Sequence, residues 1–533
     1  MEDFKLSSQN EVRARFSPSP TGNLHVGLAR TALFNYLFTR KIQGRFILRI
    51  EDTDVERSDK SFEIDIIDGL KWLGIDWDEG PDIGGKYGPY RQSERTEIYA
   101  KYLEKLLKEG HAYYCFCSEE ELEAKRQYQM SIGQPPVYDG KCRNLPPETI
   151  KKCLSEGKKS IIRFKVPDKK AVSFEDLIRG EIVFEADLIG DFSIAKDLKS
   201  PLYNFAAVID DFEMKISHVI RGEDHISNTP RQILIQEALG FPHPEYAHLP
   251  LILGQDRTKL SKRHGAGSIT EYRKLGYLPE TIINFIAFLG WNPGTEREIF
   301  SLPSLVKEFS LEKVQKGGAI FNVKRLDFLN GFYIRQKSIE RLTELCLPFL
   351  IEAGFIEKAK NNPGKNPHPG ELKLFEEKKP SYKIKETGEA ISLDYLEKIV
   401  KIYQERLKKL SEIIELADYF FREKLGYNKG LLKWKEMTDK EIKNSLETLE
   451  KILSRIKEEN WNKENLEISL MPEAEREGDR GEILWPFRVA LTGKEASAGP
   501  FEIAEILGKE KTLKRIINAH NILCARPSTE VHK

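Results

Sequence analysis

The sequence predicts an α/β protein in which an open parallel sheet is interrupted by an α+β insertion and followed by an all-α region. Three observations support this fold class. Strand, loop, helix and strand patterns follow one another in residues 12–50, a block of cysteines, prolines and short alternating segments occupies residues 113–195, and helical spacing dominates from about residue 266. A strand–helix–strand order joins parallel strands, whereas a later run of helices forms a body of its own.

The first elements can be placed directly on the sequence. Val12, Ala14 and Phe16 alternate with charged residues, which indicates a strand. The loop SPSPTG follows, and apolar residues at helical spacing then run from about 24 to 38. The next strand, RFILRI at 45–50, ends in the acidic cluster EDTD, and an amphipathic helix is expected at 97–109. These elements form the first half of a nucleotide-binding sheet, residues 1–112.

The sheet pattern returns after the inserted block. MKISHVI at 214–220 is typical of a strand, and Pro230 and Gly240 bracket a helix, with proline in its first turn and glycine just beyond its end. We therefore assign 113–195 to the insertion and 196–265 to the second half of the sheet domain. Two helical regions, 266–340 and 341–533, follow. A flexible insert is expected at about 357–392, around NNPGKNPHPG at 361–370.

Composition excludes several classes of protein. The 533 residues carry 84 Lys and Arg against 84 Asp and Glu, and 40% are hydrophobic, which suffices for several packed cores. The longest apolar run, 282–289, is too short to cross a bilayer, and the first residues lack an apolar signal segment. Six cysteines are too few for a disulfide scaffold. We expect a cytoplasmic protein without a membrane partner.

Two motifs predict a site for a polyphosphate. PSPTGNLHVG at 18–27 lies where a strand passes into a helix, and unpaired N–H groups and the helix dipole attract phosphate there. Its His25 could donate a hydrogen bond to a phosphate whose charge grows in the transition state. KLSKR at 259–263 adds three cations on a loop after an apolar strand, which could neutralise a leaving pyrophosphate.

The surrounding residues carry a resemblance to a known family. RFSPSPTGNLHVGLARTALFNYLF, FILRIEDTD, GPYRQSER, YDGKCR, YNFAAVIDD, VIRGEDH and KLSKRHG occur in this order. The chain therefore resembles the bacterial glutamyl-tRNA synthetases, which are class I aminoacyl-tRNA synthetases, most densely over residues 11–335. The second histidine of the family's HIGH motif is Leu28 here, so that histidine's role is not transferred.

The resemblance implies a Rossmann-type catalytic domain, an inserted domain that binds the tRNA acceptor end (113–195), a helical stem-contact domain (266–340) and an α-helical anticodon-binding region (341–533). It also implies ATP-dependent attachment of L-glutamate to tRNA-Glu through a glutamyl-adenylate, with release of AMP and pyrophosphate. Mg²⁺ would accompany ATP, tRNA would have to bind before glutamate is activated, and the protein would be a monomer.

Two alternatives remain open at this point. One is a non-discriminating enzyme that also charges tRNA-Gln, and the other is a non-catalytic tRNA-binding protein. A small-molecule adenylyl- or cytidylyltransferase would not need about 200 helical residues after its catalytic domain. The presence of both His25 and Lys262 argues against a non-catalytic module.

The predicted substrate sites draw on both motifs. The catalytic residues would be His25, Lys259 and Lys262. The ATP site would comprise Thr21, His25, Gly27, Asp224, Lys259, Ser261, Lys262 and Arg263. Glutamate has two carboxylates and one ammonium, for which arginines and a carboxylate are natural partners. The glutamate site would comprise Arg15, Ser17, Glu51, Tyr203 and Arg221, and which arginine holds which carboxylate stays open.

A structural Zn²⁺ is a further hypothesis. Cys115, Cys117 and Cys142, with Tyr138, could form a closed tetrahedral site. Many relatives use a histidine where this chain has Asn144, and some use a tyrosine at the position of Tyr138. The other interpretation is a group of reduced, partly buried cysteines.

The charge balance conceals segregated regions. Residues 141–170 hold ten basic and three acidic residues, a net +7, and residues 307–341 hold eight and four, a net +4. Residues 51–80 hold three basic and eleven acidic residues, a net −8. Such polarity is compatible with a tRNA partner bound through its phosphates. By resemblance, Arg406 would read the third anticodon base.

Overall fold

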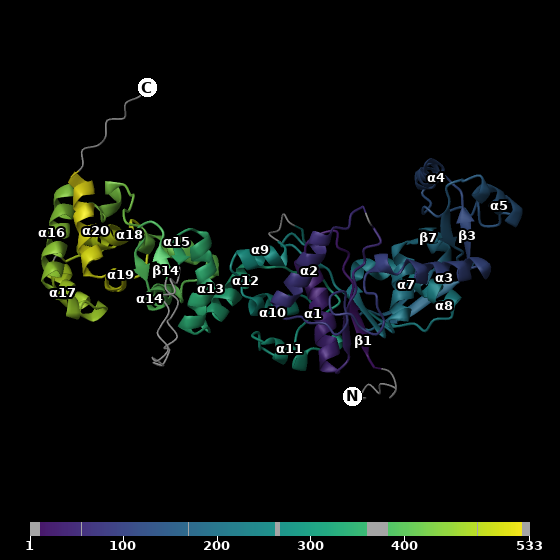
Figure 1. Ribbon diagram of the computed structural model, residues 1–533, viewed down its shortest axis with the longest axis horizontal. Helices are drawn as coiled ribbons and strands as arrows, with labels where there is room; N and C mark the ends of the chain where they lie inside the picture. The colour runs from purple at the N-terminus through teal and green to yellow at the C-terminus, as the bar shows by residue number, and fades with distance from the viewer. Residues whose placement is uncertain are drawn as a thin grey trace, which may run out of the picture. The chain divides into compact units, whose positions relative to one another are not determined.

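Six strands form the central sheet of the protein, in the order β2-β1-β9-β10-β5-β6. The computed structural model describes residues 11–54, 56–168, 170–261, 267–359, 382–476 and 478–524 (Figure 1). They divide into two units. The first comprises the described residues up to Arg273 together with Leu278–Leu326, and the second comprises Lys274–Tyr277 and the described residues from Asp327 onward.

The parallel part of the sheet confirms the predicted strand–helix–strand unit. β1 (Arg13–Phe16) pairs in parallel with β2 (Arg45–Leu48) and with β9 (His218–Gly222), and β9 pairs with β10 (Glu245–Leu249). Helix α1 (Val26–Lys41) packs against β1, β2 and β9. Because all these strands are parallel, their carboxyl ends bring the segments after Phe16, Leu48 and Gly222 to one edge, where open α/β sheets bind ligands.

Three further helices pack with one another: α3 (Thr96–Lys108), α7 (Tyr203–Glu213) and α8 (Thr229–Leu239). They share an apolar core with the sheet that includes Tyr99, Phe205 and Val219. Helix α8 confirms the predicted boundaries, since Pro230 lies in its first turn and Gly240 ends it in the left-handed conformation, with φ of 69°.

The block at 113–195 has a divided structure. β3 (Ala112–Cys115), β4 (Ile161–Phe164), β7 (Phe192–Asp197) and β8 (Ser200–Pro201) form a separate antiparallel sheet, accompanied by α4 (Glu119–Ser131), α5 (Pro147–Ser155) and α6 (Ala186–Ile189). In contrast, β5 (Ala171–Asp176) and β6 (Gly180–Glu185) form a hairpin that joins the central sheet, with Asp176 opposite Tyr246 of β10. The insertion therefore returns two strands to the domain that it interrupts.

The remaining elements of the first unit cover and extend this domain. They are α2 (Lys60–Leu73), β11 (Ile252–Leu253), α10 (Pro279–Ala287), α11 (Leu302–Glu308) and β12 (Ala319–Ile320), while α9 (Ile269–Lys274) and α12 (Val323–Arg335) cross into the second unit. No helix among the described residues combines the length and the apolar character needed to cross a membrane.

The second unit is mostly helical, but it is not entirely so. Its helices are α13 (Ile339–Glu352), α14 (Leu393–Tyr403), α15 (Ile413–Ala417), α16 (Asp439–Arg455), α17 (Lys463–Arg476), α18 (Gly481–Thr492), α19 (Pro500–Leu507) and α20 (Lys509–Cys524). A small antiparallel sheet joins β13 (Ile356–Lys358), β14 (Tyr382–Ile384) and β15 (Ala390–Ile391).

This sheet modifies one expectation, the all-α region, which in its described residues is helical apart from these three short strands. Ile356 on one side of the predicted insert and Tyr382, Ile384 and Ile391 on the other are buried, so residues at both of its ends lie in folded strands. The strand at Tyr382–Ile384 alternates between buried and exposed residues over only three positions, which is too short to recognise within a Lys- and Glu-rich sequence. The segment 361–370 lies outside the described residues.

Candidate functional site

His25 begins helix α1 and fixes the geometry of the first phosphate motif. Its Nδ1 accepts hydrogen bonds from the backbone N–H groups of Gly27 (3.1 Å) and Leu28 (3.4 Å). Because Nδ1 is the acceptor, the ring proton is on Nε2. The surrounding protein lowers the pKa of His25 by limiting its hydration, and the Lys259 ammonium lowers it further. A neutral imidazole with an outward Nε2–H donor therefore stands at the helix N-terminus.

Gly27 lies close against the capping imidazole. A Cβ atom built on Gly27 would lie 3.1 Å from His25 Cε1 and 3.2 Å from Nδ1, closer than ordinary van der Waals contact. A side chain at this position would require the His25 imidazole to shift by a few tenths of an ångström. Thr21, four residues before the cap, is exposed.

The chain after the second motif is tied to the first. The N–H of Ile269 donates to the Leu24 carbonyl (2.8 Å). The Asp65 carboxylate accepts hydrogen bonds from the Leu24 N–H (2.8 Å) and the Thr270 hydroxyl (2.6 Å). These contacts hold the segments carrying the two predicted phosphate motifs together, and sequence reasoning missed Asp65 because an acidic residue on an amphipathic helix gives no local signal.

On the other side of the second motif, Lys259 Nζ lies 3.3 Å from Asp224 Oδ2. The pKa of Asp224 is lowered by His225 and Lys259, which outweigh the opposing effect of burial. Ser261 is exposed. Lys262 and Arg263 lie outside the described residues. The structure thus brings together His25, Asp224 and Lys259 of the predicted ATP site.

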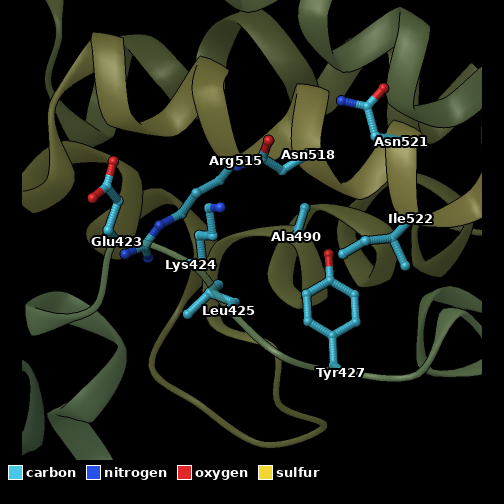
Figure 2. A pocket seen from close by; sticks show the side chains of 9 residues that line it. All are labelled: Glu423, Lys424, Leu425, Tyr427, Ala490, Arg515, Asn518, Asn521 and Ile522. Atoms are coloured by element: carbon cyan, nitrogen blue, oxygen red, sulfur yellow. The ribbon is translucent and has the colours of Figure 1, made fainter.

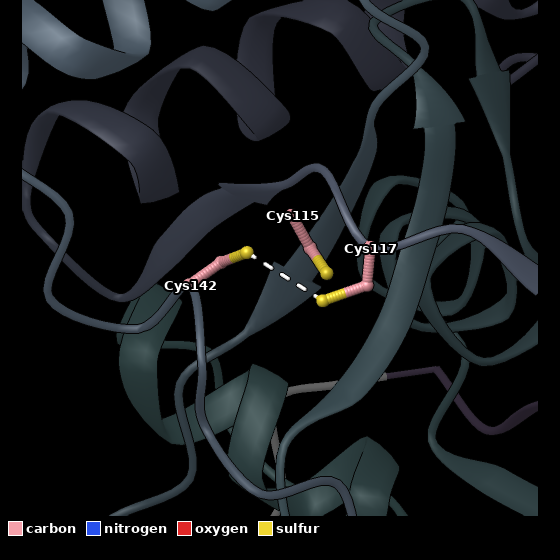
Figure 3. A group of neighbouring side chains, drawn as sticks. All are labelled: Cys115, Cys117 and Cys142. Atoms are coloured by element: carbon pink, nitrogen blue, oxygen red, sulfur yellow. Dashed lines mark hydrogen bonds between the residues drawn. The ribbon is translucent and has the colours of Figure 1, made fainter. Parts of the chain in front are cut away.

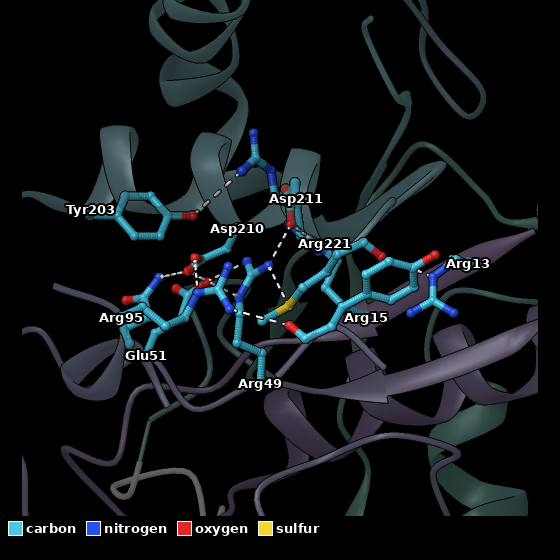
Figure 4. Close-up of polar contacts among 12 residues, drawn as sticks. Arg13, Arg15, Arg49, Glu51, Arg95, Tyr203, Asp210, Asp211 and Arg221 are labelled. Atoms are coloured by element: carbon cyan, nitrogen blue, oxygen red, sulfur yellow. Dashed lines mark hydrogen bonds and ion pairs between the residues drawn. The ribbon is translucent and has the colours of Figure 1, made fainter. Parts of the chain in front are cut away.

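A chain of buried charges leads away from Arg15 at the end of β1 (Figure 4). Arg15 donates two hydrogen bonds to Asp211, from Nε (3.0 Å) and Nη2 (3.3 Å). Asp211 also accepts from Arg49 (2.7 Å), which in turn donates to Glu51 (2.8 Å). Burial would raise the pKa of Asp211, but Arg15 and Arg49 outweigh it and lower that pKa. Burial raises the pKa of Glu51, although Arg49 opposes the shift.

Sequence reasoning missed Arg49 and Asp211, together with the neighbouring pair Asp210 and Arg95, whose Oδ1 and Nε lie 2.6 Å apart. A usable signal exists in the chain. Arg49 interrupts the apolar run RFILRI, and the two aspartates close the apolar helix sequence YNFAAVIDD. A charge inside an apolar run is buried, and a buried charge requires a partner.

Arg221 reaches the same region from the end of β9. Its Nε donates to His248 Nε2 (3.2 Å), Nη2 donates to the Thr229 hydroxyl (2.8 Å), and Nη1 donates to the Tyr203 hydroxyl (3.4 Å). Burial raises the pKa of Tyr203, whose hydroxyl also feels the charges of Arg221, Glu51 and Arg15, so the predicted glutamate-site residues converge.

Two polar groups of this region lack a matching partner among the described residues. The Ser17 hydroxyl is buried and has no hydrogen-bond partner among the described residues. Arg221 is only 5% exposed, and the hydrogen bonds described for it all go to uncharged groups. A buried cation without an anionic partner is costly. A ligand carboxylate would supply that partner.

Three cysteines gather beside β3 (Figure 3). The Sγ atoms of Cys115, Cys117 and Cys142 all lie within 4.8 Å of one another, and those of Cys117 and Cys142 are 3.7 Å apart. The Tyr138 hydroxyl lies 3.4 Å from Cys115 Sγ and 3.5 Å from Cys117 Sγ, whereas Asn144 is exposed. With Zn–S bonds of about 2.3 Å, the edges of a sulfur tetrahedron are about 3.8 Å long. The four groups therefore fit a zinc ion.

In the second unit, Arg406 follows α14 and is exposed, and its guanidinium donates to the Ser497 carbonyl (2.5 Å). A pocket of about 350 Å³ lies between the segment before α16 and helices α18 and α20 (Figure 2). Its Arg515 donates to the backbone carbonyls of Leu491, Tyr419 and Arg422. Arg515 is the buried cation of the pocket lining, and these hydrogen bonds give it a structural role.

Comparison with known proteins identifies the family to which the chain is related. Residues 11–328 match the model described as tRNA synthetases class I (E and Q), catalytic domain, and residues 341–520 match the anticodon binding domain. The glutamate–tRNA ligase of Carboxydothermus hydrogenoformans is 47% identical over 96% of this chain and all of that protein. Glutamate–tRNA ligase 1 of Caldicellulosiruptor saccharolyticus is 48% identical over 95% of this chain and 98% of its own length.

A solved structure extends the comparison to the fold. The crystal structure of a glutamate tRNA ligase from Elizabethkingia meningosepticum, in complex with its amino acid, superposes with a TM-score of 0.80 at 33% identity. The superposition covers 96% of this chain and 99% of that one.

Proposed function

This chain belongs to the bacterial glutamate–tRNA ligases, class I aminoacyl-tRNA synthetases that join glutamate to tRNA with ATP, and from that membership we propose how its residues divide the reaction. One observation carries the proposal. The buried Arg221 is bonded only to uncharged groups among the described residues, beside Glu51 and Tyr203 and at the sheet edge that also holds His25. A ligand with carboxylates and an ammonium matches these charges.

In the first step, a glutamate α-carboxylate oxygen bonds to the α-phosphorus of ATP, and the bond from that phosphorus to the bridging oxygen of pyrophosphate breaks. His25 would donate its Nε2–H to a phosphate oxygen that gains charge, and Lys259 would neutralise the leaving pyrophosphate. Mg²⁺ bound to the ATP phosphates would add positive charge there. We assign Lys262 and Arg263 to the same phosphate-binding role on the basis of the sequence alone, because they lie outside the described residues.

Within the proposed glutamate site, Arg15 and Arg221 would each hold a carboxylate, and Glu51 would accept the ammonium. The Ser17 hydroxyl, which has no hydrogen-bond partner among the described residues, would gain one from the ligand. In the second step, the terminal ribose hydroxyl of tRNA attacks the acyl carbon and AMP leaves. Neither step needs a covalent bond to the enzyme, so positioning and charge carry the catalysis.

The test is ATP–pyrophosphate exchange with glutamate or glutamine, with and without tRNA-Glu. We expect glutamate-dependent exchange in the presence of tRNA-Glu, and a loss of at least 100-fold in Arg221→Ala. The matched control is Arg57→Ala, because the Arg57 side chain is 76% exposed. The proposal fails if wild-type protein with tRNA-Glu gives no glutamate-dependent exchange.

We also propose one structural Zn²⁺ held by Cys115, Cys117, Cys142 and Tyr138. The sulfur and oxygen separations of 3.4–3.7 Å support it. The ion would cross-link the end of β3 to the loop that carries Tyr138 and Cys142. Metal analysis of purified protein should find one zinc per chain, lost in Cys117→Ser, weakened in Tyr138→Phe and unchanged in Asn144→Ala. Unaltered zinc in Tyr138→Phe together with loss in Asn144→Ala would refute the ligand set.

For anticodon discrimination we propose Arg406. It is exposed, and its bond to the Ser497 carbonyl fixes the guanidinium on the surface of the second unit. We expect Arg406→Gln to charge tRNA-Gln with glutamate better than the parent does. Equal charging of tRNA-Gln by both proteins would remove Arg406 from this role.

Family membership and the charge distribution together suggest a path for the tRNA. We propose that the block at 113–195 binds the acceptor end, 266–340 the stem and 341–533 the anticodon, with the basic excess at 141–170 and 307–341 facing phosphates. We also propose a cytoplasmic monomer, since one chain supplies every side chain of the proposed site. Light scattering in solution tests the monomer, and the salt dependence of tRNA binding tests the phosphate contacts.

A further inference from the structure

A fully buried Asp–His pair lies directly behind Arg221. Asp176 is 1% exposed and His248 is 0% exposed, and Asp176 Oδ2 lies 2.6 Å from His248 Nδ1. The same oxygen accepts from the His248 backbone N–H (3.0 Å). Asp176 Oδ1 accepts from the N–H groups of Ile178 (3.0 Å) and Arg179 (2.9 Å). Four donors thus surround one carboxylate, which requires its ionised form.

This arrangement determines where the imidazole proton is. An ionised Asp176 can only accept, so His248 Nδ1 carries the proton and Nε2 carries the lone pair. Burial lowers the pKa of His248 and outweighs the opposing effect of Asp176, which favours this neutral form. Nε2 is therefore the acceptor for the Arg221 Nε–H at 3.2 Å.

A second acceptor holds the next nitrogen of the same guanidinium. The Thr229 hydroxyl accepts from Arg221 Nη2 (2.8 Å), and its oxygen lies 3.1 Å from His248 Nε2 and 3.3 Å from the His225 carbonyl oxygen. With Nε and Nη2 both held, the guanidinium plane cannot turn, and its Nη1 edge faces the Tyr203 hydroxyl. That edge is the one that would meet a carboxylate.

We propose that His248 and Asp176 are positioning residues for glutamate: Asp176 fixes the tautomer of His248, and His248 fixes the guanidinium of Arg221. The inference rests on the proposed role of Arg221 as a carboxylate ligand. Asp176 ends β5, so the hairpin that the insertion returns to the central sheet takes part in amino-acid recognition.

We call the contacts from Asp176 through His248 to Arg221 the relay. Two amide variants of His248 test its two contacts separately, the one to Arg221 and the one to Asp176. In His248→Gln the amide oxygen reaches the position of Nε2 and can accept from Arg221, whereas in His248→Asn the shorter amide reaches only the Nδ1 position and Asp176. Both variants keep a polar amide at a buried site. The control is His243→Gln, because His243 is exposed.

The measurements are KM for glutamate and KM for ATP in charging of tRNA-Glu by the full chain. Loss of a hydrogen bond to a charged group corresponds to about a tenfold to hundredfold effect. We expect His248→Asn and Asp176→Asn to raise KM for glutamate at least tenfold with little change in KM for ATP. His248→Gln should stay within about threefold of wild type.

Several results would overturn the relay. Equal KM values for glutamate in the Gln and Asn variants would do so, as would parallel increases in both KM values, which indicate a purely structural role. Because the two variants are compared with each other, a general loss of stability does not mimic the expected pattern. Wild-type protein that fails to charge tRNA-Glu would instead refute the proposed function.

Discussion

Replacing His25 by asparagine separates the capping role of its imidazole from the donor role that we propose for it. Nδ1 caps helix α1, and Nε2–H, for which no acceptor is found among the described residues, is the donor in the proposed mechanism. Asparagine is among the best N-cap residues, because its side-chain oxygen accepts from the same backbone N–H groups. His25→Asn therefore keeps the cap and removes the donor, and His25→Ala removes both.

The expected magnitudes differ for the two roles. Loss of an N-cap costs about 1 kcal/mol of stability, so only His25→Ala should lower the free energy of unfolding by that amount. Loss of a donor to a charge that develops in the transition state costs about 2.7–4 kcal/mol of activation free energy, or a factor of about 10² to 10³. Both variants should show this loss of rate.

The assay is the rate of tRNA-dependent ATP–pyrophosphate exchange at saturating substrates, with urea unfolding measured in parallel and exposed His243→Asn as control. Exchange by His25→Asn within threefold of wild type would refute the donor role. If the free energy of unfolding falls as much in His25→Asn as in His25→Ala, the claim that asparagine preserves the N-cap of helix α1 is refuted.

Three further predictions follow from packing and charge. Gly27→Ala should reduce exchange at least tenfold, because its Cβ would lie 3.1 Å from His25 Cε1; unchanged exchange would contradict this contact. Asp65→Ala should lower the free energy of unfolding by about 2 kcal/mol and slow exchange, since the carboxylate joins the two phosphate motifs; a change in neither would contradict it. Burial lowers the pKa of His218 to about 4. Below pH 6.5 the unfolded chain gains a proton at this residue that the folded chain does not, so stability should fall by up to about 3 kcal/mol between pH 6.5 and 4. His218→Phe should flatten that part of a urea-unfolding series, and an identical pH profile would contradict the assignment.

The sequence predicts the local parts of this fold well. β1, α1, β2 and α8 lie where alternation, helical spacing and the Pro230–Gly240 pair indicate them, and β9 (His218–Gly222) overlaps the end of the strand predicted at 214–220. The predicted thiols and tyrosine do meet, with Cys115 at the end of β3 and Tyr138 and Cys142 on a later loop. The helices and strands depend on neighbours within a few residues, whereas the cluster joins segments more than 20 residues apart.

Long-range pairing could not be predicted in the same way. The strand β5 shows a clear buried–exposed alternation, yet nothing in residues 171–176 indicates whether its partner is β4 within the insertion or β10 about 70 residues later. The relay from Asp176 to Arg221 depends on that choice and is invisible without it. Asp65 is a similar case, because its partners Leu24 and Thr270 lie 41 and 205 residues away.

The buried charges show why the two arginines of the proposed glutamate site are not equivalent. Arg15 and Arg49 share the carboxylates of Asp211 and Glu51, so that group of four is neutral without a ligand. Arg221 has His248, Thr229 and Tyr203 instead, all neutral, and its positive charge is uncompensated among the described residues. A substrate carboxylate at Arg221 removes the cost of a buried unpaired charge, whereas one at Arg15 joins a balance that already exists. If Arg221 holds a substrate carboxylate as proposed, binding free energy from charge neutralisation is concentrated at this guanidinium, which three neutral acceptors hold in place.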